Sequence, residues 1–426
     1  MMKQIHRITM DHFDKLLIRL ALLSTLLLAT TASLKAQSLE GYLQMGASEN
    51  PGLKAQYKLY LAALEKVEQQ GALPDPTVSF GYFISPIETR VGAQRLRLSL
   101  RQMFPWMGTL KVKKHWATHR AKVQYEAFIE TRNQLFLAIQ KQWLALYLLE
   151  KEIQIMQNDL DILRSYEPVT QTKYESNLVS LADLVRVQIK VEEATTKLDI
   201  LKLKKRPLLS EFNRLLNREA SIPVSLPDSI ILTIAPVSLD SAMVSQPRIR
   251  AVKSQIEVAN DEVALANLKS RPSLGFGLDY AMVDQREAVV LEDNGKDVLM
   301  PMVSLSLPVF GKKNRASKKE AQLKKEAFSH QLEQEQRSLR SQWDQATFEI
   351  EKARTELTLY ENELDKTELL LKTLIAEYTN NNREFESLLD VQQMMLELRL
   401  QQLRAEIRLQ EHLFQKEYLT GNYFAQ

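Results

Sequence analysis

Cysteine is absent from the 426-residue chain, and glycine is scarce. Without cysteine the protein has no disulfide, no thiolate metal ligand, no thiol nucleophile and no lipid attached to an N-terminal cysteine. Glycine occurs 12 times, and none lies between Thr109 and Leu274 or between Lys312 and Thr420. Because tight turns favour glycine, these stretches predict long helices and disfavour a doubly wound enzyme or an all-β domain.

The first 36 residues have the features of a secretory signal peptide. Four basic residues precede an apolar run at 20–29, and small residues follow it. We expect cleavage after Ala36, with Ala32 as the alternative. The chain that remains has equal numbers of acidic and basic residues, which gives no reason to expect a nucleic-acid partner.

The two halves of the chain repeat one pattern at a spacing of about 200 residues. The matching pairs are 174–188 with 378–392, 100–108 with 303–311, and 76–81 with 272–277. Because the matches keep one order, we predict a tandem duplication. The first structural repeat is placed at 37–236 and the second at 237–426.

Each repeat is predicted to contain a helix, a β-hairpin and two long helices. Apolar residues alternate with polar ones at 76–104 and 272–308, which indicates the hairpins. Apolar seams at 3-4 spacing, which demand partner helices, predict long helices at 109–175, 180–217, 313–380 and 385–418. The first of these would be roughly 100 Å long. Pro168 and Pro207 lie inside two of them, where we expect kinks or breaks.

Four short strands do not close a barrel alone, yet strands that enter lipid must have every edge paired. We expect no transmembrane helix after residue 36, because no stretch of about 18 residues is apolar and uncharged. Any membrane insertion would therefore use strands pooled from several copies of the chain. Phe104, Trp106 and Phe310, at the strand ends, suit a membrane interface.

Basic residues cluster just after each hairpin, at the expected start of a long helix. Cations there oppose the helix dipole, so we expect phospholipid headgroups of the outer membrane to offset them. The alternative is a solvated run of charge. The clusters are Lys111, Lys113, Lys114, Arg120 and Lys122, and Lys312, Lys313, Arg315, Lys318, Lys319, Lys324 and Lys325.

The duplicated plan resembles the TolC-like outer membrane efflux proteins over nearly the whole chain after the signal peptide. The motifs that carry the resemblance are Leu-Pro-Asp-Pro at 73–76, Gln-Met-Phe-Pro-Trp-Met-Gly at 102–108 and Leu-Pro-Val-Phe-Gly at 307–311, with a similar helix-tip pattern in both repeats. The resemblance implies a mainly α fold with a small β part. Long antiparallel helices would form an α-helical barrel, and each chain of a homotrimer would contribute four strands to one transmembrane β-barrel.

The same resemblance implies an outer membrane channel of a Gram-negative cell that extends into the periplasm. It would be the passive exit duct of a tripartite efflux system, docked on a periplasmic adaptor and a proton-driven or ATP-driven inner-membrane pump. Type I protein secretion is the alternative within this class. A periplasmic coiled-coil scaffold is the alternative outside it, although the paired strands disfavour it.

The tip of the helical part carries the residues that match the family's closed aperture. Asn177 and Asn381 stand where a glycine usually turns the chain, and asparagine tolerates the left-handed conformation. Arg383 and Asp390 match aperture residues of the second repeat, and Asp183 matches one of the first. Symmetry would form them into rings that gate the channel; the alternative is ordinary capping and surface charge.

Two further sets of residues are functional candidates. Leu178, Val179 and Phe385 are expected to be exposed apolar residues at the tip that contact the adaptor. Arg95, Arg97 and Arg101 are expected to line the barrel lumen. We favour a structural role for these arginines, balanced by acidic loop residues such as Glu88, over selection of anionic cargo.

Catalytic chemistry has little support. The sequence contains no P-loop, GxGxxG or GxSxG motif. His115 and His119 lie one helical turn apart, but no third metal ligand is evident, and surface residues are the preferred interpretation. We expect no enzymatic activity, no cofactor and no metal site.

Overall fold

The computed structural model describes residues 38–230, 238–287, 290, 292–381 and 385–421. The expected signal peptide at 1–36 and the aperture candidate Arg383 lie outside these residues. The chain forms two compact units, and each unit takes segments from both halves of the sequence. Of the described residues, those within 55–130 and 243–339 form one unit. Those within 38–54, 131–242 and 340–421 form the other, which we call the tip unit.

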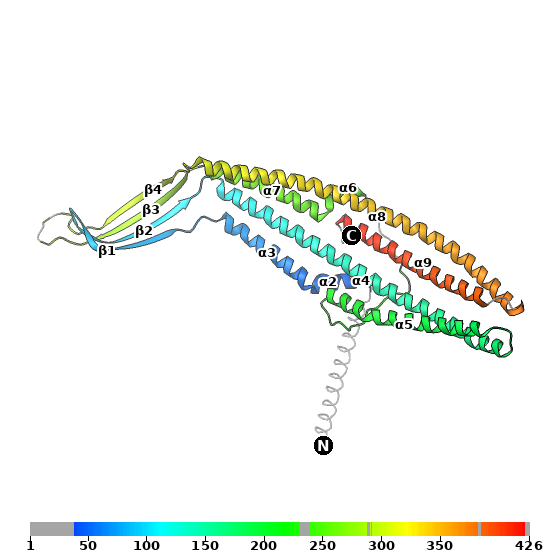
Figure 1. Cartoon of the computed structure of the whole chain (residues 1–426). Coiled ribbons are helices and arrows are strands. Elements are labelled where there is room, and N and C mark those ends of the chain that lie inside the picture. The colour runs from blue at the N-terminus through cyan, green and yellow to red at the C-terminus, as the bar shows by residue number, and fades with distance from the viewer. Residues whose placement is uncertain (1–37, 231–237, 288–289, 291, 382–384, 422–426) are drawn as a thin grey trace, which may run out of the picture. The chain divides into compact units, whose positions relative to one another are not determined.

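The first of these units contains an antiparallel sheet in the order β1-β2-β3-β4 (Figure 1). Its strands are β1 (Thr77–Thr89), β2 (Gly92–Phe104), β3 (Ser273–Val283) and β4 (Val298–Ser306). The two hairpins join through β2 and β3, where Leu100 pairs with Leu278. The tight turn of the first hairpin needs Gly92, which has a φ of 132° and lies against the backbone of Asp284.

Helices make up most of the remaining structure. The two longest are α4 (Thr109–Glu175) and α8 (Gly311–Asn381), and each supplies residues to both units. The others are α2 (Leu39–Glu49), α3 (Pro51–Gly71), α5 (Leu181–Leu215), α6 (Leu239–Ser245), α7 (Pro247–Leu268) and α9 (Phe385–Thr420). The order of elements is the same in both halves, which supports the proposed duplication. The mainly α fold with a small antiparallel sheet is confirmed.

Of the kinks or breaks expected at the two internal prolines, the breaks do not occur. Pro168 lies inside α4 and Pro207 inside α5, and both helices continue past them. Each proline removes one backbone donor from its helix, and the turns on either side hold the helix together across it. Among the described residues, no helix is long and apolar enough to cross a membrane.

The core of the tip unit lies between helices from both repeats. Leu160 of α4, Val187 and Leu198 of α5, and Leu388 of α9 are buried together there. This arrangement buries the apolar seam of each helix against the others, which is the partnership that the 3-4 spacing requires.

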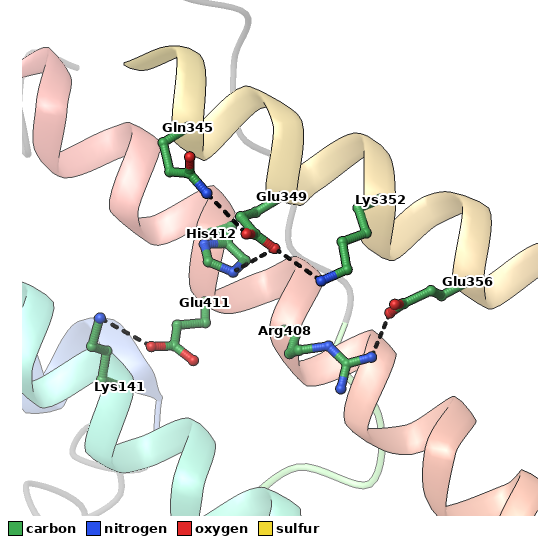
Figure 2. A network of polar contacts seen from close by, with 8 residues as sticks. All are labelled: Lys141, Gln345, Glu349, Lys352, Glu356, Arg408, Glu411 and His412. Carbon is green, nitrogen blue, oxygen red and sulfur yellow. Dashed lines mark hydrogen bonds and ion pairs between the residues drawn. The ribbon is translucent and has the colours of Figure 1, made fainter. Parts of the chain in front are cut away.

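Polar contacts also fix α9 between α4 and α8 in this unit (Figure 2). On one side, Lys141 of α4 lies 2.9 Å from Glu411 of α9. On the other side, Arg408 of α9 pairs with Glu356 of α8. His412 lies 4.0 Å from Glu349, whose carboxylate also accepts a hydrogen bond from Gln345 at 2.9 Å. Exposed pairs of this kind contribute little energy each, so they set the register of α9 more than its stability.

Candidate functional site

One face of the sheet is apolar and uncovered. Cross-strand pairs place Phe80 opposite Leu98 and Phe276 opposite Val303, so the apolar side chains of four strands share that face. Phe80 is 67% exposed and Val303 is 72% exposed. The other exposed apolar residues of the same strands are Val78, Tyr82, Leu98, Leu100, Leu274, Phe276, Leu278, Leu299 and Leu305. A continuous apolar surface of this kind marks contact with lipid or another protein.

The opposite face carries the three arginines that are expected to line the lumen. Arg97 forms an ion pair with Asp279 of β3, and Arg95 with Asp284. Asp279 is only 3% exposed. Arg101 forms no ion pair within the described part of the chain. The structure therefore leaves Arg101 as the candidate for an uncompensated charge on this face.

The expected balance between these arginines and Glu88 is wrong. Glu88 instead lies 3.3 Å from Arg286. The partners of Arg95 and Arg97 come from the second hairpin, because β3 lies beside β2 in the sheet. The acidic groups that offset the two arginines are thus supplied by the other repeat.

The three interface candidates lie at or just beyond the strand ends. Phe104 closes β2 and packs edge-on against Phe276, with ring centroids 5.7 Å apart. Trp106 and Phe310 lie beyond β2 and β4, and both are exposed. Their position suits the proposed aromatic girdle.

The tip between α4 and α5 turns at Asn177. This residue has a φ of 58°, the left-handed conformation that asparagine tolerates. The turn closes through the Leu178 N–H, which donates to the Lys173 carbonyl at 2.8 Å. A capping box then starts α5, because the Asp183 carboxylate accepts from the Ser180 N–H at 3.0 Å and the Ser180 hydroxyl accepts from the Asp183 N–H at 3.2 Å.

The expectation that Phe385 is exposed is wrong. Its side chain is 3% exposed and packs edge-on against Tyr166, with ring centroids 5.8 Å apart. Tyr378 lies on another side at 5.3 Å. Burial among aromatic rings from α4 and α8 removes Phe385 from the surface that a partner could contact. Leu178, in contrast, is 51% exposed, and Val179 is half-buried.

No family model matches the sequence, and no curated protein matches it. Solved structures do. A membrane protein from Pseudomonas aeruginosa is 16% identical, with a TM-score of 0.77 over 90% of this chain and 93% of its own. VceC of Vibrio cholerae is 14% identical, with a TM-score of 0.76 over 90% and 96%. The CmeC outer membrane channel of Campylobacter jejuni is 12% identical, with a TM-score of 0.76 over 91% and 86%. The chain has the TolC-like fold.

Within this TolC-like fold the aperture candidates remain a proposal. Asp390 is exposed on α9, and Asn381 is the last residue of α8. Asp183 is engaged locally as the partner of Ser180, so its first role is to begin α5. The Asp183 carboxylate is hydrogen-bonded to Ser180 at the start of its own helix. Asp390 is therefore the better candidate of the two for an aperture ring.

A buried carboxyl group behind the tip was missed at the sequence level. Asp159 of α4 is 6% exposed and accepts a hydrogen bond from Gln392 of α9 at 2.9 Å. Burial raises the pKa of Asp159, although Gln392, Arg399 and Lys197 act in the opposite direction. The folded state therefore favours the protonated acid. This contribution to stability is present below the unfolded pKa and is lost as pH rises through the folded pKa.

We expect Asp159→Asn to stabilise the protein at neutral pH, because the amide removes a buried charge and can still accept from Gln392. The expected gain in Tm is about 2–4 °C, the shift produced by about 1 kcal/mol in a unit of this size. The gain should vanish in acid. Asp161→Asn, the same change at an exposed position, is the control in thermal melts, and it should leave Tm unchanged. An equal gain in Tm at both positions would contradict the conclusion that burial of the Asp159 charge destabilises the protein.

The histidine pair does not assemble a metal site in the described ranges. His119 Nδ1 lies 2.7 Å from Asp261 Oδ2. No group of three or more His, Cys, Asp or Glu side chains is placed to hold a metal ion among the residues that the structure describes. His119 thus joins α4 to α7 within the unit that bears the sheet.

Proposed function

We propose that this chain is the outer membrane exit duct of a tripartite efflux system and conducts its substrates passively. The observation that carries the proposal is the apolar sheet face, which nothing covers in the described chain. A water-soluble scaffold would have to hide this surface, whereas an outer membrane strand presents it to lipid. The fold shared with solved outer membrane channels supports the same reading.

The sheet also needs partner strands. β1 and β4 are its two edges, and their outer hydrogen-bonding groups have no neighbour in the described chain. Open edges are not tolerated in lipid, so the sheet must close with strands of other copies. A homotrimer that pools its strands into one barrel satisfies this requirement.

The helices of the tip unit support association between copies as well. α5 carries exposed apolar residues at nearly regular helical spacing, at Leu181, Val185 and Ile189. α8 carries a second exposed set, at Leu359, Leu369, Leu370 and Ile375. The stripe on α5 is typical of a helix that packs against a further helix. We propose that the copies pack their helices into an α-helical barrel that extends into the periplasm and meets the adaptor at the tip.

Planar-bilayer conductance of the purified full-length protein tests the function. We expect discrete channels from a trimer that separates into monomers only when it is heated in detergent. Recovery of a soluble monomer by osmotic shock, without channel activity, would contradict the duct and favour the periplasmic scaffold.

A further inference from the structure

A hollow of about 350 Å³ lies in the unit that bears the sheet, near the ends of four helices. Its walls come from the end of α3, the start of α4, the last turns of α7 and the first turns of α8. The residues that carry the argument are Thr109, Lys113, Glu262, Lys269, Glu320 and Lys324.

The charges around this hollow are unevenly paired. Lys324 Nζ lies 2.8 Å from Glu320 Oε1 and 3.6 Å from Glu262 Oε2, so one cation serves both carboxylates. Glu262 also accepts a hydrogen bond from the Trp116 indole at 3.3 Å. Lys113 and Lys269 form no ion pair within the described part of the chain. Three lysines thus face two carboxylates, and the hollow carries an excess of one positive charge.

The N-terminus of α4 adds two features that favour an anion. Thr109 begins the helix and its first turn contains no acidic residue, so the positive end of the helix dipole lies beside the hollow without a carboxylate from its own turn. The Thr109 side chain is 9% exposed, and its hydroxyl has no hydrogen-bond partner among the described residues. An unpaired buried hydroxyl is costly, and an acceptor oxygen entering the hollow would satisfy it.

We propose that this hollow binds the phosphoethanolamine headgroup of a phospholipid. The phosphate oxygens accept from Lys113, Lys269 and Thr109, and the ammonium group faces Glu320. Because the hollow carries both signs of charge, a zwitterionic headgroup fits it better than an inorganic anion does.

The position of the hollow next to the proposed membrane band points to a lipid as the source of the phosphate, and this step rests on the proposed function. β2 ends at Phe104 and β4 at Ser306, a few residues before α4 and α8 begin. The connecting residues Trp106, Met107, Val309 and Phe310 are exposed and apolar. Acyl chains attached to a headgroup in the hollow would find this apolar surface beside them.

Native mass spectrometry of the full-length protein in detergent tests the site with three short-chain or free probes. These are dihexanoyl phosphatidylethanolamine, dihexanoyl phosphatidylcholine and inorganic phosphate. We expect the phosphatidylethanolamine to bind most tightly, because the choline headgroup has no N–H to donate to a carboxylate. Lys113→Gln/Lys269→Gln should weaken its binding by about tenfold or more.

The matched control is Lys58→Gln/Lys253→Gln, which removes the same charge from α3 and α7 at exposed positions outside the hollow. It should bind the lipid like the wild type. Equal loss in both double variants, or none in either, would overturn the site. Equal binding of phosphate or of the choline lipid would show an anion or lipid site of another kind and would overturn the proposed ligand. Channel conductance of the same preparation separates the two proposals, since a conducting protein without the lipid site disproves only this inference.

Discussion

Phe80→Arg should abolish assembly of the protein in the outer membrane, whereas Ser79→Arg should leave it nearly intact. Phe80 belongs to the exposed apolar face of the sheet, and Ser79 points to the opposite face, where it pairs with Ser99. An arginine on the lipid face of a barrel costs about 2–4 kcal/mol near the centre of the bilayer. In a symmetric trimer that cost is incurred once in every copy.

Membrane fractionation and unheated gel electrophoresis measure the effect as the amount of trimer in the outer membrane fraction. Val303→Arg, on β4, repeats the change at a second point of the same face and should behave like Phe80→Arg. Wild-type amounts of trimer in both lipid-face variants would refute the membrane assignment of this face. Equal loss in Ser79→Arg would indicate that β1 tolerates no bulky cation on either face.

The apolar face was predictable because alternation along one strand is a local property. Val78, Phe80 and Tyr82 alternate with small or polar residues, and the structure places them together on the exposed face. The partners of Arg95 and Arg97 were not predictable in the same way. Their carboxylates reach them through the pairing of β2 with β3, which joins segments about 180 residues apart.

The long helices were predictable from the scarcity of glycine and from the apolar seams, and the observed ends of α4 are the predicted ones. The surroundings of individual residues within these helices were harder to predict. Pro168 lies inside α4 without ending the helix, which the periodicity does not show. Asp159 was missed because its burial depends on α9 packing over it. The capping role of Asp183 was predictable, because Ser180 precedes it by three residues at the start of a helix, which is the capping-box pattern.

Phe385 shows most clearly why tertiary contacts decide the function of a tip residue. An aromatic residue next to a predicted turn was expected to be exposed, but the rings that cover it come from Tyr166 in α4 and Tyr378 in α8. Neither ring belongs to α9, so the periodicity of that helix does not reveal the contact. The residue therefore joins the start of α9 to the two long helices, and it serves the packing of the tip and not its outer surface.

Phe385→Ala should accordingly lower the free energy of unfolding of the tip by about 3–5 kcal/mol. The cavity would loosen the start of α9, so we also expect a higher conductance of the closed channel in planar bilayers. Phe385→Leu keeps most of the volume and should recover most of the stability in thermal melts. An alanine variant that melts and conducts like the wild type would contradict the buried anchor.

Leu178→Asp provides the contrasting case at the same tip. Because this side chain is half exposed and is not part of the buried cluster that contains Phe385, its replacement should leave Tm and trimer assembly unchanged. If Leu178 contacts the adaptor, the new charge should abolish pump-dependent efflux, since an unpaired carboxylate in an apolar interface is costly. The two variants thus separate the interior of the tip from its surface: Phe385→Ala should impair stability in the isolated channel, and Leu178→Asp should impair efflux only in the presence of the partner proteins.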